Sequence, residues 1–380
     1  MDPKECAPVA LFVYNRADNT RKTLTALLAN TLARQTDLYV FSDGGRDEAS
    51  WQAVREVRAV LHEVKEEVSR TRTLNNMTIV ERPENYYLER NIIEGINQVF
   101  EHHDTIIVLE DDIVTAPHFL EFMNDAFRLY RDEPQVMHVS GFTRLSPNPS
   151  LQREGRIYHE GGDNQTQNQD TDSGQTQNQD PNSQTLSTPL PLEGGDGGGS
   201  YFSPFMAGWG WGTWRDRWNG HFLHFKTRDE ALEGLSPEML SAIEYGGVFP
   251  CLRDLDRRPI PWDICWALAI RRAEGLCLYP SQTLVRNIGL DAGTHFRTLD
   301  RQFTLFGKRL RLPLSRLIQR YEFDRPPYMR PIVLTRQTPA KDPAVEAAMA
   351  RALTDWGIRY TWFGSILRRL FRWFRDARWA

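Results

Sequence analysis

Residues 105–117 read TIIVLEDDIVTAP, and this stretch determines how the rest of the chain is interpreted. Its apolar first half predicts a buried strand, because none of those side chains requires water. The strand ends at three acids, Glu110, Asp111 and Asp112, and the TAP that follows predicts the start of a helix. Adjacent carboxylates repel one another and are costly to bury unless a cation or hydrogen-bond donors balance them. Open α/β sheets bind ligands at the carboxyl ends of their strands, so we expect a divalent-metal and phosphate site here.

Strands and helices alternate around this stretch through the first 140 residues. Apolar runs predict strands at 8–14, 38–41, 77–80, 105–109 and 135–140, and amphipathic segments predict helices at 19–28, 46–69, 89–100 and 117–130. This alternation predicts an α/β fold with a mostly parallel central sheet flanked by helices on both faces. The second strand runs into SDGG, whose glycines allow the backbone to approach a ligand closely.

A segment of different composition interrupts the chain after this α/β part. Residues 161–200 contain no aromatic residue, lysine or arginine, and the hexapeptide QTQNQD occurs there twice. Such a segment cannot bury enough apolar area to offset its ordering entropy, so we expect a disordered insertion with no catalytic part. It separates a first half at 1–160 from a second half of the same domain at 201–335, and a tail follows at 336–380.

Composition and charge exclude several classes of protein. The chain of 380 residues has a net charge of −4, which argues against a nucleic-acid binder with its basic footprint. Its four cysteines show no C-x-x-C spacing, so neither a zinc site nor a disulfide framework is indicated. The start of the chain has no signal-peptide pattern and no apolar run long enough to span a bilayer, which predicts a cytoplasmic protein.

Aromatic residues are concentrated after the insertion. Residues 205–218 read FMAGWGWGTWRDRW, in which Trp209 and Trp211 alternate with glycines. One interpretation is a core of aromatic rings with tight turns between them. The other is a platform on which a sugar ring stacks, because flat faces with small neighbours suit carbohydrate C–H surfaces. The sequence leaves both open.

Two further polar groups lie in the second half. Asp263 sits in PIPWDICWALAIRR, at the start of an apolar helical run. It either caps that helix or provides a carboxylate of raised pKa in an apolar wall, as a general base requires. His295 lies in the turn-rich loop NIGLDAGTHF, where structural and functional roles are equally open.

The C-terminal end is basic and amphipathic. From residue 351 onward there are seven arginines and two aspartates, and apolar residues recur at helical spacing. This composition predicts a helix lying on an anionic membrane surface, here the inner face of the plasma membrane. The alternative is a helix that docks on the domain itself or on a partner protein.

The ordered motifs VALFVYNR, FSDGG, ENYYLERNIIEGINQVF, IIVLEDDIVTAPHF, GWGWGTW, PWDICWA and NIGLDAGTHF resemble those of nucleotide-sugar-dependent glycosyltransferases of the GT-A fold. The resemblance is closest to N-acetylglucosaminyltransferase I and its bacterial relatives. It covers about residues 8–160 and 201–300, and leaves out the insertion and the tail. It therefore implies a nucleotide-sugar-binding first half and an acceptor-side second half.

The resemblance implies roles for residues of the first half. Arg16 would reach the nucleotide base or ribose, and Asp43 would accept from uracil N3–H. The pair Arg90 and Asn91 would face the nucleotide sugar. Asn91 stands where the eukaryotic enzymes have a histidine, and the absence of an N-terminal anchor implies a bacterial setting.

The resemblance implies that the acid triplet binds the metal ion and the donor sugar nucleotide. Asp112 would ligate Mn²⁺ or Mg²⁺, hard cations that complete their coordination with diphosphate oxygens. Glu110 and Asp111 would lie near ribose and donor hydroxyls, and His295 near the diphosphate. Such a cation offsets the charge on the departing UDP.

Asp263 matches the catalytic base of the inverting members, and Trp209 and Trp211 would bind the acceptor. We therefore expect a metal-dependent inverting transferase that moves a hexose or N-acetylhexosamine from a UDP-sugar to a hydroxyl of a glycan or lipid-linked glycan. A retaining transferase on the same fold and a non-catalytic carbohydrate-binding protein are the alternatives. A sugar-1-phosphate nucleotidyltransferase is disfavoured, because its glycine-rich opening is missing after the first strand.

Overall fold

The structure is a computed structural model that describes residues 6–143, 145, 199–247, 249–289, 301–305, 308–312 and 327–353. Residues 161–198 of the predicted insertion, His295 and the basic stripe beyond residue 353 lie outside the described residues. A separate hairpin, β11 (Arg301–Leu305) and β12 (Lys308–Leu312), pairs in antiparallel register.

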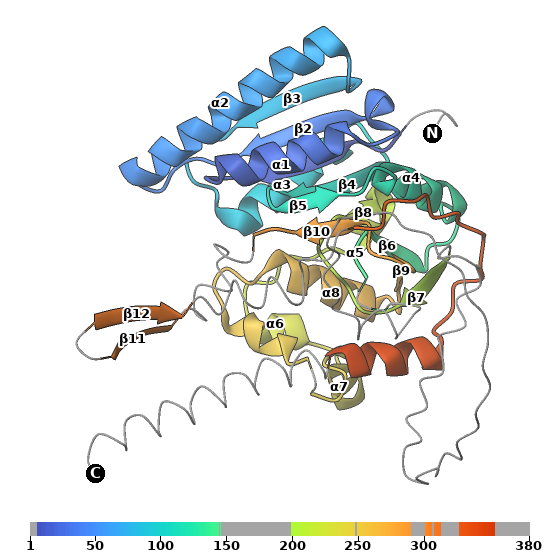
Figure 1. Ribbon diagram of the computed structural model, residues 1–380. Coiled ribbons are helices and arrows are strands. Elements are labelled where there is room, and N and C mark those ends of the chain that lie inside the picture. The colour runs from blue at the N-terminus through green and yellow to red at the C-terminus, as the bar shows by residue number, and fades with distance from the viewer. Residues whose placement is uncertain are drawn as a thin grey trace, which may run out of the picture.

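A central sheet of eight strands forms the middle layer, in the order β3-β2-β1-β4-β8-β6-β9-β7 (Figure 1). The strands are β1 (Val9–Val13), β2 (Asp37–Ser42), β3 (Asn76–Glu81), β4 (Thr105–Glu110), β6 (Val136–Ser140), β7 (Ser200–Ser203), β8 (Trp211–Trp214) and β9 (Leu276–Pro280). Strands β8 and β7 run antiparallel to their neighbours, and the other strands of this sheet share one direction. The prediction of a mostly parallel α/β sheet is therefore confirmed.

Helices cover both faces of this sheet, as expected. They are α1 (Ala17–Leu28), α2 (Glu48–Thr71), α3 (Tyr87–Phe100), α4 (Phe119–Leu129), α5 (Arg215–His221), α6 (Arg228–Leu232), α7 (Pro237–Ile243) and α8 (Trp262–Arg272), with short 3₁₀ turns at Ala33–Gln35 and Cys251–Asp256. Helices α1, α2 and α4 bury their apolar stripes with one face of the sheet, and α3, α5 and α8 with the other. The helix α2 begins at a capping box, in which the Asp47 carboxylate accepts from Ser50 N at 2.7 Å.

The predicted helix start at TAP is wrong. Residues Ile113–Thr115 form a short strand, β5, which pairs with β10 (Val285–Asn287) in antiparallel register. The pairing continues past β5, because Ala116 N donates to the carbonyl oxygen of Leu284 at 2.7 Å. The Thr115 hydroxyl accepts from Asn30 Nδ2 instead of capping a helix, and α4 begins only at Phe119.

A further helix occupies residues 343–353, inside the predicted tail. Its Val345, Met349 and Leu353 are buried in the same core as α3, α5 and α8. The Glu346 carboxylate accepts from the Ser203 hydroxyl at 2.7 Å and from the Tyr245 hydroxyl at 3.3 Å. This first part of the tail therefore docks on the domain.

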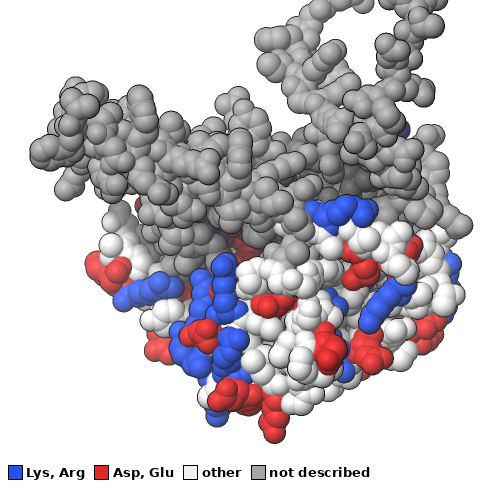
Figure 2. Space-filling model, turned by 90° about the horizontal axis from the view of Figure 1, so that it is seen from below, with Lys and Arg blue, Asp and Glu red and all other residues white. Residues whose placement is uncertain are grey.

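The face seen from below carries acidic side chains interspersed with the basic ones, although the basic ones gather toward one side (Figure 2). Within the described residues, every helix is too short or too polar to cross a lipid bilayer.

Candidate active site

The candidate site lies where β1, β2 and β4 end side by side. In the register of the sheet, Phe12 of β1 pairs with Glu110 of β4, and Val13 pairs with Ser42 of β2. The residues that follow these strands therefore meet at one edge. Arg16 follows β1, Asp43 follows β2, and the acid triplet begins at the last residue of β4. The structure thus brings Arg16, Asp43 and the acid triplet to one edge of the sheet, and their role in binding a metal and a phosphate stays a prediction.

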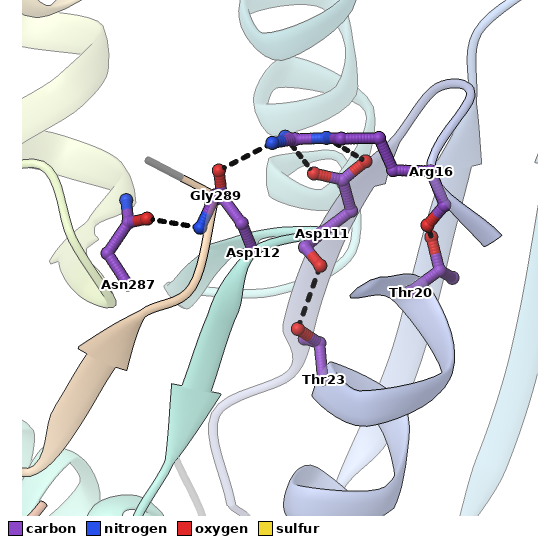
Figure 3. Close-up of polar contacts among 7 residues, drawn as sticks. All are labelled: Arg16, Thr20, Thr23, Asp111, Asp112, Asn287 and Gly289. Atoms are coloured by element: carbon purple, nitrogen blue, oxygen red, sulfur yellow. Dashed lines mark hydrogen bonds and ion pairs between the residues drawn. The ribbon is translucent and has the colours of Figure 1, made fainter. Parts of the chain in front are cut away.

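The Arg16 guanidinium holds two acids of the triplet (Figure 3). It forms a two-pronged ion pair with Asp111, in which Nε lies 3.3 Å from Oδ2 and Nη2 donates to Oδ1. Its Nη1 donates to Asp112 Oδ2 at 2.9 Å. Burial would lower the pKa of Arg16, but the two carboxylates raise it above its ordinary value. Burial is nevertheless the main cause that raises the pKa of Asp111, to about 7, and Arg16 opposes that rise. One cation that follows the neighbouring strand thus holds both carboxylates in place.

Backbone contacts fix the same acids from two more sides. The Thr23 hydroxyl of α1 donates to the carbonyl oxygen of Asp111 at 2.9 Å. Ile288 N, just after β10, donates to the carbonyl oxygen of Asp112 at 2.8 Å. Gly289 N then donates to Asn287 Oδ1 at 2.8 Å (Figure 3). The end of β4 is therefore held by segments from both halves of the chain.

Gly289 is a site residue that the sequence reasoning missed. A Cβ atom placed on it would lie 1.9 Å from Asp112 Oδ2 and 2.6 Å from Arg16 Nη1. Any larger residue would displace the ion pair, so the glycine is required by close approach and not by a turn. The Asn-x-Gly pattern after β10 was the available signal, although it predicts only a loop.

Glu110 differs from its two neighbours, because no hydrogen bond to it comes from the described part of the chain. It is half-buried, and burial is the main cause that raises its pKa, followed by the charges of Asp112 and Asp111. Asp263 is close enough to raise the pKa of Glu110 as well. Burial and Asp263 also raise the pKa of Glu89, in the first turn of α3. The charge of Asp263, in α8, thus acts on a carboxylate of β4 and on one of α3.

Asp263 lies in the first turn of α8, two residues after the capping position, which Pro261 occupies. It is half-buried, and its Oδ1 accepts from Ile264 N at 2.9 Å. It therefore does engage a free N–H group at the helix start, as the capping alternative requires. Its proximity to Glu110 equally suits the catalytic alternative, so both roles remain compatible with its position.

Asp43 is 5% exposed, and neighbouring groups hold its carboxylate. Oδ1 accepts from Gly44 N at 2.9 Å and from Tyr86 N at 2.7 Å, and Oδ2 accepts from Asn85 Nδ2 at 3.0 Å. Burial raises its pKa against these hydrogen bonds. Asp43 therefore joins the loops that follow β2 and β3, and Oδ2 keeps capacity for a further donor.

Arg90 and Asn91 have different surroundings. Arg90 is exposed, pairs with Glu94 at 2.8 Å, and stacks 3.6 Å from the centre of the Tyr86 ring. Asn91 is buried, and its Oδ1 accepts from Arg82 Nε at 3.0 Å. Arg82 is a second residue that the sequence reasoning missed, because a single arginine after a strand belongs to no motif.

The two tryptophans predicted to bind the acceptor differ in burial. Trp211 is completely buried, stacked between His138 and Trp262 with ring centres 5.2 Å from each. It cannot present a face to a sugar, so the prediction that Trp211 binds the acceptor is corrected. Trp209 is only partly buried, packed edge-on against Phe142 at 4.6 Å, and remains a candidate for acceptor binding.

The metal prediction can be compared with the donor atoms present. Among the described residues, no group of three or more His, Cys, Asp or Glu side chains is arranged to hold a metal ion. Asp112 offers a carboxylate whose Oδ2 is taken by Arg16 and whose Oδ1 accepts no hydrogen bond from the described residues. A hard cation with one protein ligand and diphosphate oxygens fits this donor set, and a site made of protein ligands alone does not.

Ion-paired acids lie at the carboxyl edge of this α/β sheet, which is where open α/β sheets bind ligands. Residues 1–145 match the model of the GNT-I family. The part of the chain that carries Arg16, Asp43 and the acid triplet is therefore similar to that family. No curated protein matches the sequence.

Matches to solved structures cover less of the molecule. TarS 1–349 of S. aureus, in complex with UDP-GlcNAc, is 14% identical, with a TM-score of 0.26 over 35% of this chain and 33% of that one. The mannosyltransferase PcManGT of Pyrobaculum calidifontis, in complex with GDP-Man and Mn²⁺, is 18% identical, with a TM-score of 0.26 over 40% of each chain. TM-scores this low leave the donor and the acceptor of this chain unassigned.

Proposed function

We propose that this protein is a metal-dependent inverting glycosyltransferase, which moves a hexose or N-acetylhexosamine from a UDP-sugar to a hydroxyl of a glycan or lipid-linked glycan. The observation that carries the proposal is the edge of the sheet at which Arg16 fixes Asp111 and Asp112, beside Glu110, whose raised pKa has a smaller contribution from the charge of Asp263. Asp263 comes from α8 and the triplet from β4, and Ile288 N of the second half donates to the carbonyl oxygen of Asp112, which supports a site built from both halves of the chain.

Arg16 and the acid triplet have separate roles toward the donor. A divalent cation held through Asp112 would offset the negative charge that develops on the departing diphosphate. Arg16 pairs with Asp111 and Asp112 and fixes their orientation, so that little reorganisation is needed when the donor binds. Glu110 accepts from a donor hydroxyl, because its carboxylate receives no hydrogen bond from the described residues.

Asp263 carries the acceptor-side step. Its carboxylate removes the proton from the acceptor hydroxyl while the oxygen of that hydroxyl forms a bond to the anomeric carbon. The bond from that carbon to the UDP oxygen breaks on the opposite face, which inverts the configuration.

The test compares Asp263→Asn with Asp229→Asn. Asp229 occupies the same position in the first turn of α6 as Asp263 does in α8, but its side chain is exposed. Loss of a general base should reduce turnover by about 10²- to 10⁴-fold in Asp263→Asn, whereas Asp229→Asn should retain it. Turnover is measured as UDP release from a panel of UDP-sugars with Mn²⁺.

Two outcomes would contradict the proposal. If Asp263→Asn turns over as fast as the unmodified protein, Asp263 only caps α8, and a retaining mechanism becomes the better candidate. NMR of the anomeric proton in the product then distinguishes retention from inversion. If no UDP-sugar is turned over or bound with Mn²⁺, the non-catalytic carbohydrate-binding alternative gains.

A further inference from the structure

Arg82, directly after β3, is a buried cation with an unused donor. It is 9% exposed, and its Nε donates to Asn91 Oδ1 of α3 at 3.0 Å. Its guanidinium carbon lies 4.8 Å from the centre of the Tyr86 ring and 5.3 Å from that of Phe41. Arg82 Nη2 is buried and has no hydrogen-bond partner among the described residues. A buried N–H group without an acceptor is costly, and a bound ligand that provides one would explain it.

The contact with Asn91 gives the direction of the unused donor. In a guanidinium group, the Nε–H bond and one N–H bond of Nη2 point in parallel, as in two-pronged pairs with carboxylates. Because Nε points at Asn91 Oδ1, one of the two N–H bonds of Nη2 points to the space beside that oxygen. The same contact assigns the other end of the amide as Nδ2, which donates to no described residue. Arg82 and Asn91 together therefore offer two N–H donors to an oxygen-rich ligand.

The place of Arg82 in the sheet indicates which part of a nucleotide these donors meet. Strand β3 lies three positions from β4, and adjacent strands are about 4.8 Å apart, so the two strand ends are roughly 14 Å apart. Arg82 is thus remote from the acid triplet, where the diphosphate is expected. It is near Asp43, since Tyr86 N donates to Asp43 Oδ1 at 2.7 Å and the Tyr86 ring covers Arg82. The donors therefore face the base end of the nucleotide.

We propose that Arg82 Nη2, with Asn91 Nδ2 beside it, donates to a carbonyl oxygen of the pyrimidine base and makes the site selective for uridine over cytidine. The proposal rests on the UDP-sugar function given above. With Asp43 as acceptor for N3–H, the protein presents an acceptor beside donors, which complements the uracil edge. Cytosine carries an amino donor in place of one uracil carbonyl, and its N3 is an acceptor. Both positions would then be mismatched.

The experiment is isothermal titration of UDP and of CDP, each with Mn²⁺, into the unmodified protein, Arg82→Met and Arg58→Met. Arg58 is the matched control, because its guanidinium lies at the same strand end, donates to the carbonyl oxygen of Arg82 at 2.7 Å and pairs with Glu81 at 3.1 Å. We expect Arg82→Met to bind UDP about 10- to 100-fold more weakly, as for loss of a charged hydrogen bond, and to lose the preference over CDP by the same factor. Arg58→Met should keep the preference.

A second variant separates recognition from folding. Arg82→Lys keeps the charge but lacks the fork of parallel donors, so we expect it to lose most of the preference for UDP while staying folded by circular dichroism. If the folded variants keep the UDP-to-CDP ratio of the unmodified protein, the inference is overturned and the proposed function stands. If the unmodified protein binds no UDP with Mn²⁺, the proposed function fails, and this inference fails with it.

Discussion

The two halves of the central sheet are packed with different kinds of side chain. In β3-β2-β1-β4 the interior is mostly aliphatic, and charged groups follow the ends of the strands. In β8-β6-β9-β7 the interior is dominated by rings, with Trp211, Trp218 and Trp266 in mutual contact. The buried titratable groups there include His138, which stacks on Trp211. The proposed chemistry therefore depends on residues at the carboxyl edge of β3-β2-β1-β4. The aromatic interior of β8-β6-β9-β7 contributes instead to the stability of the fold.

The largest effect that would test this division is expected in the aromatic half. Trp266 is fully buried, and its Nε1 donates to His138 Nδ1 at 3.3 Å. We expect Trp266→Ala to lower the free energy of unfolding by about 3–5 kcal/mol, because it removes a large buried ring and leaves a cavity. Chemical denaturation measures this loss. Trp51→Ala, at a half-buried position on α2, is the control and should cost less. Equal losses in the two variants would remove the distinction between the halves.

A substitution at Gly289, beside the acid triplet, should affect turnover more than stability. The Cβ of Gly289→Ala would crowd Asp112 Oδ2 and Arg16 Nη1, and so displace the carboxylate that we assign to the metal. A displacement of this kind typically costs about 10²-fold in rate, so we expect that loss in UDP-sugar turnover with little change in stability. In Gly208→Ala the new Cβ would meet Trp262 at an ordinary 3.5 Å. The control Gly208→Ala should retain turnover. An equal loss of turnover in both variants would show that crowding of Asp112 is not the cause.

The smallest expected effect is a dependence of stability on pH that comes from His138 in the aromatic half of the sheet. His138 donates from Nε2 to the carbonyl oxygen of Ala207 at 3.2 Å while Nδ1 accepts from Trp266, so the ring is neutral. Burial lowers its pKa from 6.5 to about 3. A depressed histidine pKa means that the unfolded chain takes up the proton first. Stability is therefore lost as pH falls from about 6.5 towards 3, by about 2 kcal/mol at pH 5.

The measurement is chemical denaturation of the unmodified protein and His138→Gln at pH 7 and pH 5. His138→Gln should lack this component of the acid-induced loss, whereas His102→Gln, an exposed position on the other half, should keep it. A loss of equal size in all three proteins would assign the acid sensitivity to other groups.

Much of the first half could be predicted because its signals are local. The apolar run before the acids, the amphipathic stripe of α2 and the residues at strand ends depend on neighbours in sequence. The pairing of β5 with β10 could not be predicted, because it depends on a segment far along the chain. For the same reason β8 was not recognised as a strand. Position 212 requires glycine, because a Cβ there would lie 2.5 Å from the carbonyl oxygen of Ile106. The alternation of glycine and tryptophan in β8 therefore reflects tight packing.

The candidate site shows the same limit. The acids, Arg16 and Asp43 could be placed at one edge from the order of strands alone. Their partners could not, since nothing local in the sequence indicates that Gly289 lies against Asp112 or that Arg82 meets Asn91. Trp211 belongs to the core because β8 lies inside the sheet, a position that only the three-dimensional pairing defines.

The insertion of β8 beside β4 has a consequence for how this protein is made. Strand β4 ends at Glu110, but the strand that completes its hydrogen bonding begins only at Trp211. During translation, the acid-bearing strand therefore leaves the ribosome with one side unpaired and waits for a distant segment, a delay during which foreign strands can add to it. Protection of the nascent chain by a chaperone should matter most in that interval, well before the last residues are synthesised.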